Sequence, residues 1–431
     1  MLYPNLSAND AGHLMFAGQD TVALAEKYGT PLLLMDEELI RSRCRVYRQA
    51  MSAYLPAGSK PLYASKAFSC KRIYEIMLEE EMCVDVVSTG ELYTAIKAGF
   101  PAENAYFHGN NKTDEDIRFA IQNRIGWFVC DSRDELYAIE AEASRQGVSQ
   151  KILLRVQPGI DPHTHEKIST GKIDCKFGAA IETGQARELT KLALSLKHIQ
   201  LKGFHCHIGS QIFDCDPFAD AASCMADYIA VIRDAYGYTP EVLNLGGGMG
   251  VPYTEKDPPI DYAENIRKIG KLFADICARR GIAAPAVLME PGRSIVADAG
   301  ITLYTVGALK TIPGFRNYVS IDGGMTDNPR YTLYQAEYTV LAANRVNDAP
   351  EGLYTVAGRC CESGDLIQEN VPLPAMKRGD LLAVLTTGAY NYSMASNYNR
   401  IPRPAVVFVT PDGSYPAVRR ETLDDLLACD L

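Results

Sequence analysis

Hydrophobic positions follow two alternating periods from about Pro31 to Arg293. Short runs of β-branched residues precede longer runs in which apolar residues recur at helical spacing, as Leu136, Ile139 and Ala143 do. This alternation is typical of βα units around a parallel sheet. Eight runs predict strands, and they begin at Pro61, Cys83, Ala105, Ile125, Lys151, Leu201, Glu241 and Ala286.

Helix starts support the same assignment. Three pairs have the spacing of a capping box, namely Ser88 with Glu91, Thr113 with Asp116, and Ser132 with Glu135. We therefore interpret Glu91 as part of a helix start and leave it out of the functional residues. Eight βα units in one block favour an α/β fold, a (β/α)8 TIM barrel over residues 31–293, rather than an open doubly wound sheet.

The pattern changes after Arg293. Alternating runs such as ITLYTVGALKTI, GLYTVAG, DLLAVLTTG and AVVFVT are separated by Gly and Pro turns and show almost no helical period. Residues 294–431 are therefore predicted to form a separate antiparallel β domain. Residues 1–30 follow no clear pattern, and we expect them to pack on this second domain.

Composition narrows the classes of function. With 47% hydrophobic and 22% charged residues the chain is globular, and 43 Lys and Arg against 53 Asp and Glu give a net charge of -10, which argues against a nucleic-acid partner. No apolar run reaches the roughly 18 residues of a membrane span, and the N-terminus lacks the pattern of a signal peptide. The 12 cysteines include no CxxC pair. We expect a cytoplasmic protein with free cysteines and no structural zinc.

The active site of a TIM barrel lies at the C-terminal ends of its strands, so polar residues there are the candidates. The first predicted strand ends in Ser65 and Lys66. A lysine at the barrel mouth can form a Schiff base with a carbonyl compound. Position alone does not distinguish it from a surface lysine at a strand end.

The seventh strand runs into GGGMG, Gly246–Gly250. This run does not match GxGxxG and no helix follows at once, which disfavours a dinucleotide site. Three successive glycines predict an anion nest for a phosphate, in a loop where barrels commonly hold one. A tight turn is the alternative.

The eighth and sixth strands supply further candidates. Glu290 and Arg293 follow the eighth strand. The carboxylate could face a ring nitrogen while the guanidinium faces a phosphate, or the two could form an ordinary surface ion pair. His205 and His207 share one face of the sixth strand, and Ser210 follows. Without a nearby Cys or carboxylate ligand, metal binding is the weaker interpretation, and an imidazole stacked on a cofactor ring fits the same spacing.

The predicted barrel mouth contains an amine, a phosphate nest and a carboxylate that could face a pyridinium nitrogen. This combination indicates pyridoxal phosphate as the ligand rather than a metal or a nucleotide. A class I aldolase would also use a lysine and a phosphate nest. It would have no use for a carboxylate that protonates a heterocycle, nor for the β domain.

Over nearly its whole length the sequence resembles the fold type III pyridoxal-phosphate decarboxylases. The motifs that carry the resemblance occur in the family's order: YASKAF, DVVSTGEL, FHGNNKT, HCHIGSQ, NLGGGMGVPY, EPGRSIVADAG, GGMTDNPRYTLY, CCESGD and GAYNYSMASNYN. The resemblance implies an alanine racemase-like barrel, pyridoxal 5'-phosphate as cofactor, no metal, and a homodimer whose active sites are shared across the interface.

The resemblance also implies a role for each matching residue. Lys66 would form the Schiff base, His207 would stack on the ring, and Glu290 would face the pyridine nitrogen and stabilise the quinonoid. The implied phosphate contacts are Ser210, Gly246, Gly247, Gly248, Gly292 and Arg293. The implied substrate contacts are Arg293, Arg330, Tyr334, Glu362 and Tyr390, of which Tyr390 also lies near the cofactor.

Cys361 matches the residue that returns a proton after carbon dioxide leaves, and in the family it comes from the partner subunit. Arg359 and Cys360 stand where relatives usually have a Pro and an apolar residue. Cys360 is therefore a second candidate for the proton donor.

The implied reaction is decarboxylation of meso-2,6-diaminopimelate to L-lysine, a step of lysine biosynthesis. Arg330, for a distal carboxylate, and Glu362 favour this substrate over ornithine, arginine, lysine or carboxynorspermidine, which remain alternatives. Alanine racemase has a similar architecture but places an Arg at the ring nitrogen, so Glu290 argues for decarboxylation. A non-catalytic carrier or a degenerate homologue is disfavoured by the second domain and by the presence of Lys66 and Cys361.

Overall fold

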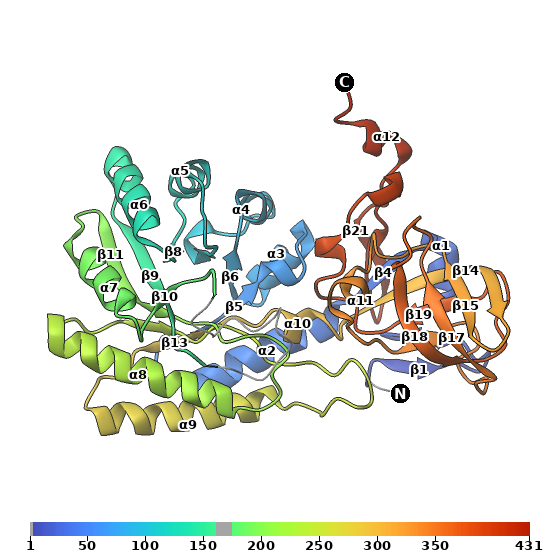
Figure 1. Cartoon of the computed structure of the whole chain (residues 1–431), viewed down its shortest axis with the longest axis horizontal. Coiled ribbons are helices and arrows are strands. Elements are labelled where there is room, and N and C mark those ends of the chain that lie inside the picture. Colours follow the sequence, from blue (N-terminus) through green and yellow to red (C-terminus); the bar gives the residue numbers. More distant parts are fainter. Residues whose placement is uncertain (1–2, 161–174) are drawn as a thin grey trace. The chain divides into compact units, whose positions relative to one another are not determined.

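The structure is a computed structural model that describes residues 3–160 and 175–431. The chain divides into two compact units, each built from more than one segment (Figure 1). The barrel unit contains residues 43–250 and 260–292. The β-rich unit contains residues 1–42, 251–259 and 293–431.

Eight parallel strands form a closed ring in the barrel unit, among the residues that are described. In chain order they are β5 (Lys60–Ala64), β6 (Cys83–Val86), β7 (Ala105–Phe107), β8 (Trp127–Cys130), β9 (Gln150–Gln157), β11 (Ile199–His205), β12 (Val242–Asn244) and β13 (Ala286–Met289). The pairing of β13 with β5 closes the ring, and the short β10 (Ala179–Ala180) pairs in parallel with the end of β9. The predicted TIM barrel is confirmed, and all eight predicted strands are present.

The helices of this unit lie outside the ring of strands (Figure 1). They are α2 (Glu37–Tyr54), α3 (Lys71–Glu79), α4 (Thr89–Lys97), α5 (Asp114–Gln122), α6 (Arg133–Gln146), α7 (Gln185–Ser195), α8 (Asp216–Tyr236) and α9 (Tyr262–Arg280), with residues 37–42 of α2 assigned to the other unit. The capping box at Thr113 is confirmed. At α4 and α6 the serine caps the helix, but the glutamate accepts from the residue before the cap, so those two boxes are incomplete.

The interior of the ring is filled by apolar side chains from most of its strands. Leu62, Tyr106, Val129 and Leu288 belong to one buried cluster. The ring of Trp127 stacks on that of Tyr106, with 5.1 Å between the centroids. Because the interior is packed with apolar groups, polar side chains are left to the strand ends.

The β-rich unit contains a three-stranded sheet, β1 (Leu6–Ala8), β2 (Leu14–Phe16) and β3 (Gln19–Asp20). Its larger sheet has the order β18 (Leu366–Leu373), β17 (Gly352–Ala357), β15 (Arg316–Ile321), β14 (Gly300–Ile312), β4 (Leu32–Asp36), β20 (Ala405–Thr410) and β21 (Gly413–Val418), with β19 (Leu381–Val384) joining β14 to β16 (Val340–Ala342). The predicted β domain is present, but two pairings, β15 with β17 and β4 with β20, are parallel.

The division of the chain differs from the predicted boundaries at two places. Strand β4 lies between β14 and β20, so residues 31–42 belong to the β-rich unit although they precede the barrel in sequence. Residues 251–259 also belong to that unit. Both segments lie within the range 31–293 that was predicted as barrel. A local pattern identifies a strand but does not say which sheet will accept it.

Short helices complete the β-rich unit: α1 (Thr21–Tyr28), α10 (Arg293–Val296), α11 (Arg330–Tyr334) and α12 (Leu423–Leu427). Leu14 and Phe16 share one buried cluster with Leu32 and Ile301, so the N-terminal segment packs on the larger sheet. Among the described residues of both units, none of the helices has the length and apolar character needed to cross a membrane.

Candidate active site

Polar side chains gather at the C-terminal ends of the barrel strands, as predicted for an active site. Six strand ends contribute, and the residues are Lys66 after β5, Asp85 in β6, His108 after β7, His205 at the end of β11 with His207 just beyond it, Asn244 at the end of β12 and Glu290 after β13. Closure of the ring brings these distant segments of the chain to one mouth.

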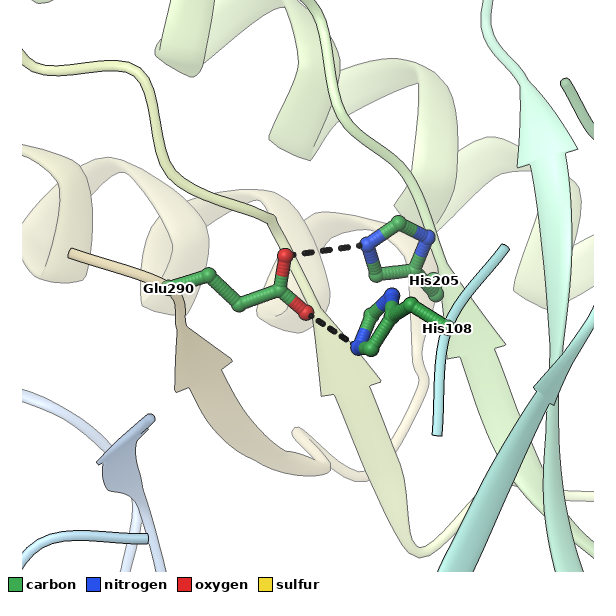
Figure 2. A group of neighbouring side chains, drawn as sticks. All are labelled: His108, His205 and Glu290. Carbon is green, nitrogen blue, oxygen red and sulfur yellow. Dashed lines mark hydrogen bonds and ion pairs between the residues drawn. The ribbon is translucent and has the colours of Figure 1, made fainter. Parts of the chain in front are cut away.

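Glu290 is the centre of this group. His108 Nε2 lies 3.0 Å from Glu290 Oε1, and His205 Nε2 lies 3.4 Å from Oε2 (Figure 2). Glu290 is only 7% exposed and His205 is fully buried. Burial alone would raise the pKa of Glu290, but the two imidazoles outweigh it and hold the pKa well below its usual range. Glu290 is therefore a buried anion.

Asn244 connects this carboxylate to the glycine loop. Its side-chain amide donates to Glu290 Oε1 at 2.7 Å, and its Oδ1 accepts from the backbone N–H of Gly246 at 2.8 Å. The side chain is fully buried. One residue at the end of β12 thus joins the two features that were predicted for the seventh and eighth strands.

The glycine loop packs tightly against neighbouring strand ends. A Cβ on Gly247 would lie 2.0 Å from the Glu290 carbonyl oxygen, so only glycine fits there. The Gly247 N–H donates to His207 Nδ1 at 3.3 Å. Ile212 N–H donates to the Gly248 carbonyl at 3.0 Å, which holds the loop containing Ser210 beside the glycines.

Lys66 lies in a short 3-10 helix, Ser65–Ala67, directly after β5. Lys66 is exposed, and its positive charge opposes the rise in pKa that burial causes at the nearby carboxyl groups of Asp85 and Glu91. Burial raises the pKa of Asp85 to about 6, although His108 and Lys66 lower it. A Cβ on Gly292 would lie 2.8 Å from the Ala64 Cβ, so Gly292 packs on the segment that carries Lys66.

His207 lies two residues after the end of β11 beside the glycine loop. Desolvation, reinforced by the neighbouring Lys66 and Arg155, holds its pKa well below the usual range. A neutral imidazole carries no charge that would oppose a cationic ring, which suits the stacking role that the sequence predicted.

A cluster of arginines and tyrosines occupies the β-rich unit. The guanidinium of Arg293 lies 4.8 Å from the ring centroid of Tyr390, and its Nη1 donates to the Tyr253 hydroxyl at 2.5 Å. Arg330 lies 5.1 Å from the Tyr253 ring and donates to the Tyr338 hydroxyl at 3.0 Å. Burial would raise the pKa of Tyr253, but the two cations outweigh it and lower the pKa. Two buried guanidinium groups are chemically suited to pair with an anion.

Three of the predicted residues of this unit lie outside the cluster. Cys361 and Glu362 are exposed, in the loop between β17 and β18, and the Cys361 N–H donates to Asn399 Oδ1 at 2.7 Å. Tyr334 ends α11 and is half-buried. The structure thus brings together Arg293, Arg330 and Tyr390 but presents the thiol on a surface.

Sequence reasoning missed several members of both groups. Asp85, His108, Asn244 and Tyr253 all occur within the quoted motifs, but no role was assigned to them. A charged residue within the buried run CVDVV was a usable signal for Asp85, because an isolated buried carboxylate is costly. Glu91 was interpreted only as a helix start, yet it is an electrostatic neighbour of Lys66.

These residues fit pyridoxal phosphate. A buried anion can hold a protonated ring nitrogen, a neutral imidazole lies beside a glycine cradle that has no room for side chains, and a lysine stands at the same mouth. The buried arginines in the β-rich unit can donate hydrogen bonds to a phosphate or a carboxylate. The fold and these groups define a barrel-type pyridoxal-phosphate enzyme.

Comparison with known proteins specifies the class further. Residues 37–297 match the pyridoxal binding domain of the pyridoxal-dependent decarboxylases. The chain is 49% identical over 425 residues to diaminopimelate decarboxylase of Bacillus subtilis (strain 168), covering 98% of this chain and 96% of the relative. The chain therefore belongs to the diaminopimelate decarboxylase family of pyridoxal-dependent decarboxylases, which confirms the predicted resemblance.

Solved structures agree with this assignment. Diaminopimelate decarboxylase from M. jannaschii in complex with L-lysine has a TM-score of 0.90 and 33% identity, covering 99% of this chain and 98% of that one. Lysine/ornithine decarboxylase from Vibrio vulnificus, in complex with putrescine, has a TM-score of 0.75 and 25% identity, covering 91% and 97%. Of these two structures, the diaminopimelate decarboxylase has the higher TM-score and the higher identity to this chain.

Proposed function

We propose that this chain decarboxylates meso-2,6-diaminopimelate to L-lysine with pyridoxal 5'-phosphate, as a step of lysine biosynthesis. The reaction and the cofactor follow from its family, in which relatives at 40–49% identity span nearly the whole chain. The observation that carries the mechanism is the buried, ionised Glu290 at the barrel mouth. The substrate is a small amino acid.

Bound pyridoxal phosphate supplies a protonated ring that accepts the electron pair left when the substrate's carboxylate departs. We assign to Lys66 the covalent attachment of the cofactor and its exchange for the substrate amine. Glu290 keeps the proton on the ring nitrogen, because a buried carboxylate stabilises an adjacent cation. His207 packs on the ring. Ser210, Gly246, Gly247, Gly248 and Gly292 belong to the loops that we assign to the phosphate end.

The arginine cluster binds the anionic ends of the ligands. We assign Arg293 to the cofactor phosphate and the substrate, and Tyr390, whose ring it contacts, to the same region. Arg330 binds the distal carboxylate of diaminopimelate, with Tyr334 and Glu362 as further substrate contacts. A planar guanidinium pairs bidentately with a carboxylate, whereas ornithine would offer it only a second amine. The buried Arg330 therefore favours diaminopimelate over the polyamine precursors.

We assign the final proton transfer to Cys361. Partial burial and Asp365 raise the pKa of the neighbouring Cys360 to about 11, which makes that thiol a weak acid. Cys361 is exposed on its own chain. An exposed thiol can serve a partner subunit, so we propose a homodimer whose sites are shared across the interface.

A cytoplasmic location remains a prediction, supported by twelve cysteines that are all free thiols. The proposed reaction is tested most directly by incubating the protein and cofactor separately with meso-diaminopimelate, ornithine and arginine and following the release of carbon dioxide. Turnover of diaminopimelate should exceed that of the other two. Faster release from ornithine would overturn the substrate assignment.

Reduction with borohydride is expected to fix the cofactor on Lys66, because a reduced carbon–nitrogen bond cannot hydrolyse. Peptide mass mapping of the yellow holoenzyme should show the added mass on the peptide that contains Lys66. The Lys66→Ala variant, treated in the same way, is the control and should carry no label. Label on another lysine would contradict the assignment.

Arg330→Ala is expected to raise KM for diaminopimelate about 10- to 150-fold, since a hydrogen bond to a charged group is worth about 1.5–3 kcal/mol. Steady-state kinetics measure the change. Arg316→Ala is the matched control, because Arg316 pairs with Glu369 on the surface of the same unit. An equal rise in KM in both variants would contradict the role of Arg330.

A further inference from the structure

His108, His205 and Asn244 surround Glu290 and have no role in the proposed chemistry. Between them they occupy both carboxylate oxygens: Asn244 and His108 face Oε1, and His205 faces Oε2. The three side chains come from different strand ends and are buried. The rings of His108 and His205 meet edge to face at 74°, with 5.0 Å between centroids, so each imidazole restrains the other.

Two of these side chains, His108 and His205, also form with Glu290 the composition of a metal site, with ligand atoms within 4.8 Å of one another. The second ring nitrogen of His205 decides whether the cluster is a metal site or a set of hydrogen-bond donors around Glu290. A metal-binding histidine donates its second N–H to an acceptor. His205 Nδ1 is buried and has no hydrogen-bond partner among the described residues. The proton therefore belongs on Nε2, where it points at Glu290.

We propose that His205, His108 and Asn244 are positioning residues that fix the Glu290 carboxylate toward the cofactor ring, and that Asn244 also ties it to the glycine loop. This inference rests on the proposed role of Glu290. Burial lowers the pKa of His205 to about 4, so it acts as a neutral donor at physiological pH. Asn244 is likewise a neutral donor.

Neutral hydrogen-bond donors are suited to keeping the Glu290 carboxylate ionised and in place. Hydrogen bonds to a carboxylate stabilise its charged form. Without them, a buried carboxylate becomes more basic and competes with the ring nitrogen for the proton. The ring then becomes a poorer electron acceptor although Glu290 is still present. Hydrogen-bond partners that orient metal ligands are worth about 10- to 100-fold in activity, and we expect an effect of the same size from the partners of Glu290.

The test measures the protonation of the ring nitrogen directly. Holoenzyme is prepared with cofactor labelled with nitrogen-15 at the ring, and its chemical shift is recorded by solid-state NMR. In His205→Leu and Asn244→Leu we expect the signal to move toward that of neutral pyridine, with the cofactor still bound and kcat lowered about 10- to 100-fold. His205→Gln, which places an amide donor near the position of Nε2, should restore much of the wild-type shift and rate.

His198→Leu is the matched control. His198 precedes β11 and pairs with Glu140 at 2.9 Å, but this pair is partly exposed at the other end of the strand. We expect neither the nitrogen-15 shift nor kcat to change. Circular dichroism shows whether each variant folds. If either His205→Leu or Asn244→Leu does not, the same measurements are made on the remaining one and on His108→Leu.

Three results would overturn the proposal, and they separate its failure from failure of the proposed role of Glu290. If Glu290→Gln moves the nitrogen-15 signal but the leucine variants do not, Glu290 keeps its role and the three positioning residues lose theirs. If Glu290→Gln also leaves the signal unchanged, both assignments fail. Binding of one equivalent of Zn²⁺ that survives addition of the cofactor, and is lost in His108→Leu, would instead assign the cluster to a metal.

Discussion

Glu290→Gln should lower kcat by about a thousandfold or more while pyridoxal phosphate remains bound. An amide is neutral and cannot hold the proton on the ring nitrogen, whereas the buried carboxylate can. Single electrostatic groups in active sites are worth about 100- to 10000-fold. Single-turnover measurements with saturating diaminopimelate, together with the absorbance of the bound cofactor, separate loss of chemistry from loss of binding.

The control for this prediction is Glu135→Gln. Glu135 is also buried in the barrel unit, but its carboxylate pairs with Lys112 Nζ at 2.7 Å and with a helix start. Its replacement should lower the melting temperature and leave kcat within a few fold of wild type. Near wild-type turnover in Glu290→Gln would show that the ring nitrogen has a different partner.

Mixing two inactive variants is expected to restore activity. Lys66→Ala and Cys361→Ala homodimers should each be nearly inactive, because one lacks the cofactor lysine and the other lacks the proton donor. If each site uses Lys66 of one chain and Cys361 of the other, a heterodimer contains one intact site. Random exchange at equal amounts should then return about a quarter of wild-type activity.

Subunit exchange must be shown independently, by co-purification of differently tagged chains. Cys360→Ala mixed with Lys66→Ala is the matched comparison, because Cys360→Ala should be active on its own if Cys361 is the donor. Failure to complement despite proven exchange would mean that each site is built within a single chain.

The barrel was predictable because its signals are local. Each strand and helix has its own period and turn residues, so all eight strands could be placed from the sequence and are present in the structure. Strand β4 shows where local signals end. All five of its residues, Leu32–Asp36, are buried, but only the pairing with β14 and β20 reveals that the strand belongs to the β-rich unit.

The sequence by itself also determined the kind of chemistry. Lys66, the glycine run and Glu290 occur at strand ends, and a TIM barrel brings such ends to one mouth whatever the details of its packing. Their residue types indicated pyridoxal phosphate before any contact was known. These inferences needed only the order of the elements and the chemistry of single side chains.

Only the tertiary structure decided which side chains meet. His108 follows β7, Asn244 ends β12 and His205 ends β11, yet all three contact the one carboxylate after β13. Tyr253 likewise joins two arginines, because its hydroxyl accepts from Arg293 and its ring lies under the guanidinium of Arg330. Such contacts depend on ring closure, strand register and side-chain direction, which arise from the packing of the whole unit, and therefore no local pattern could specify them.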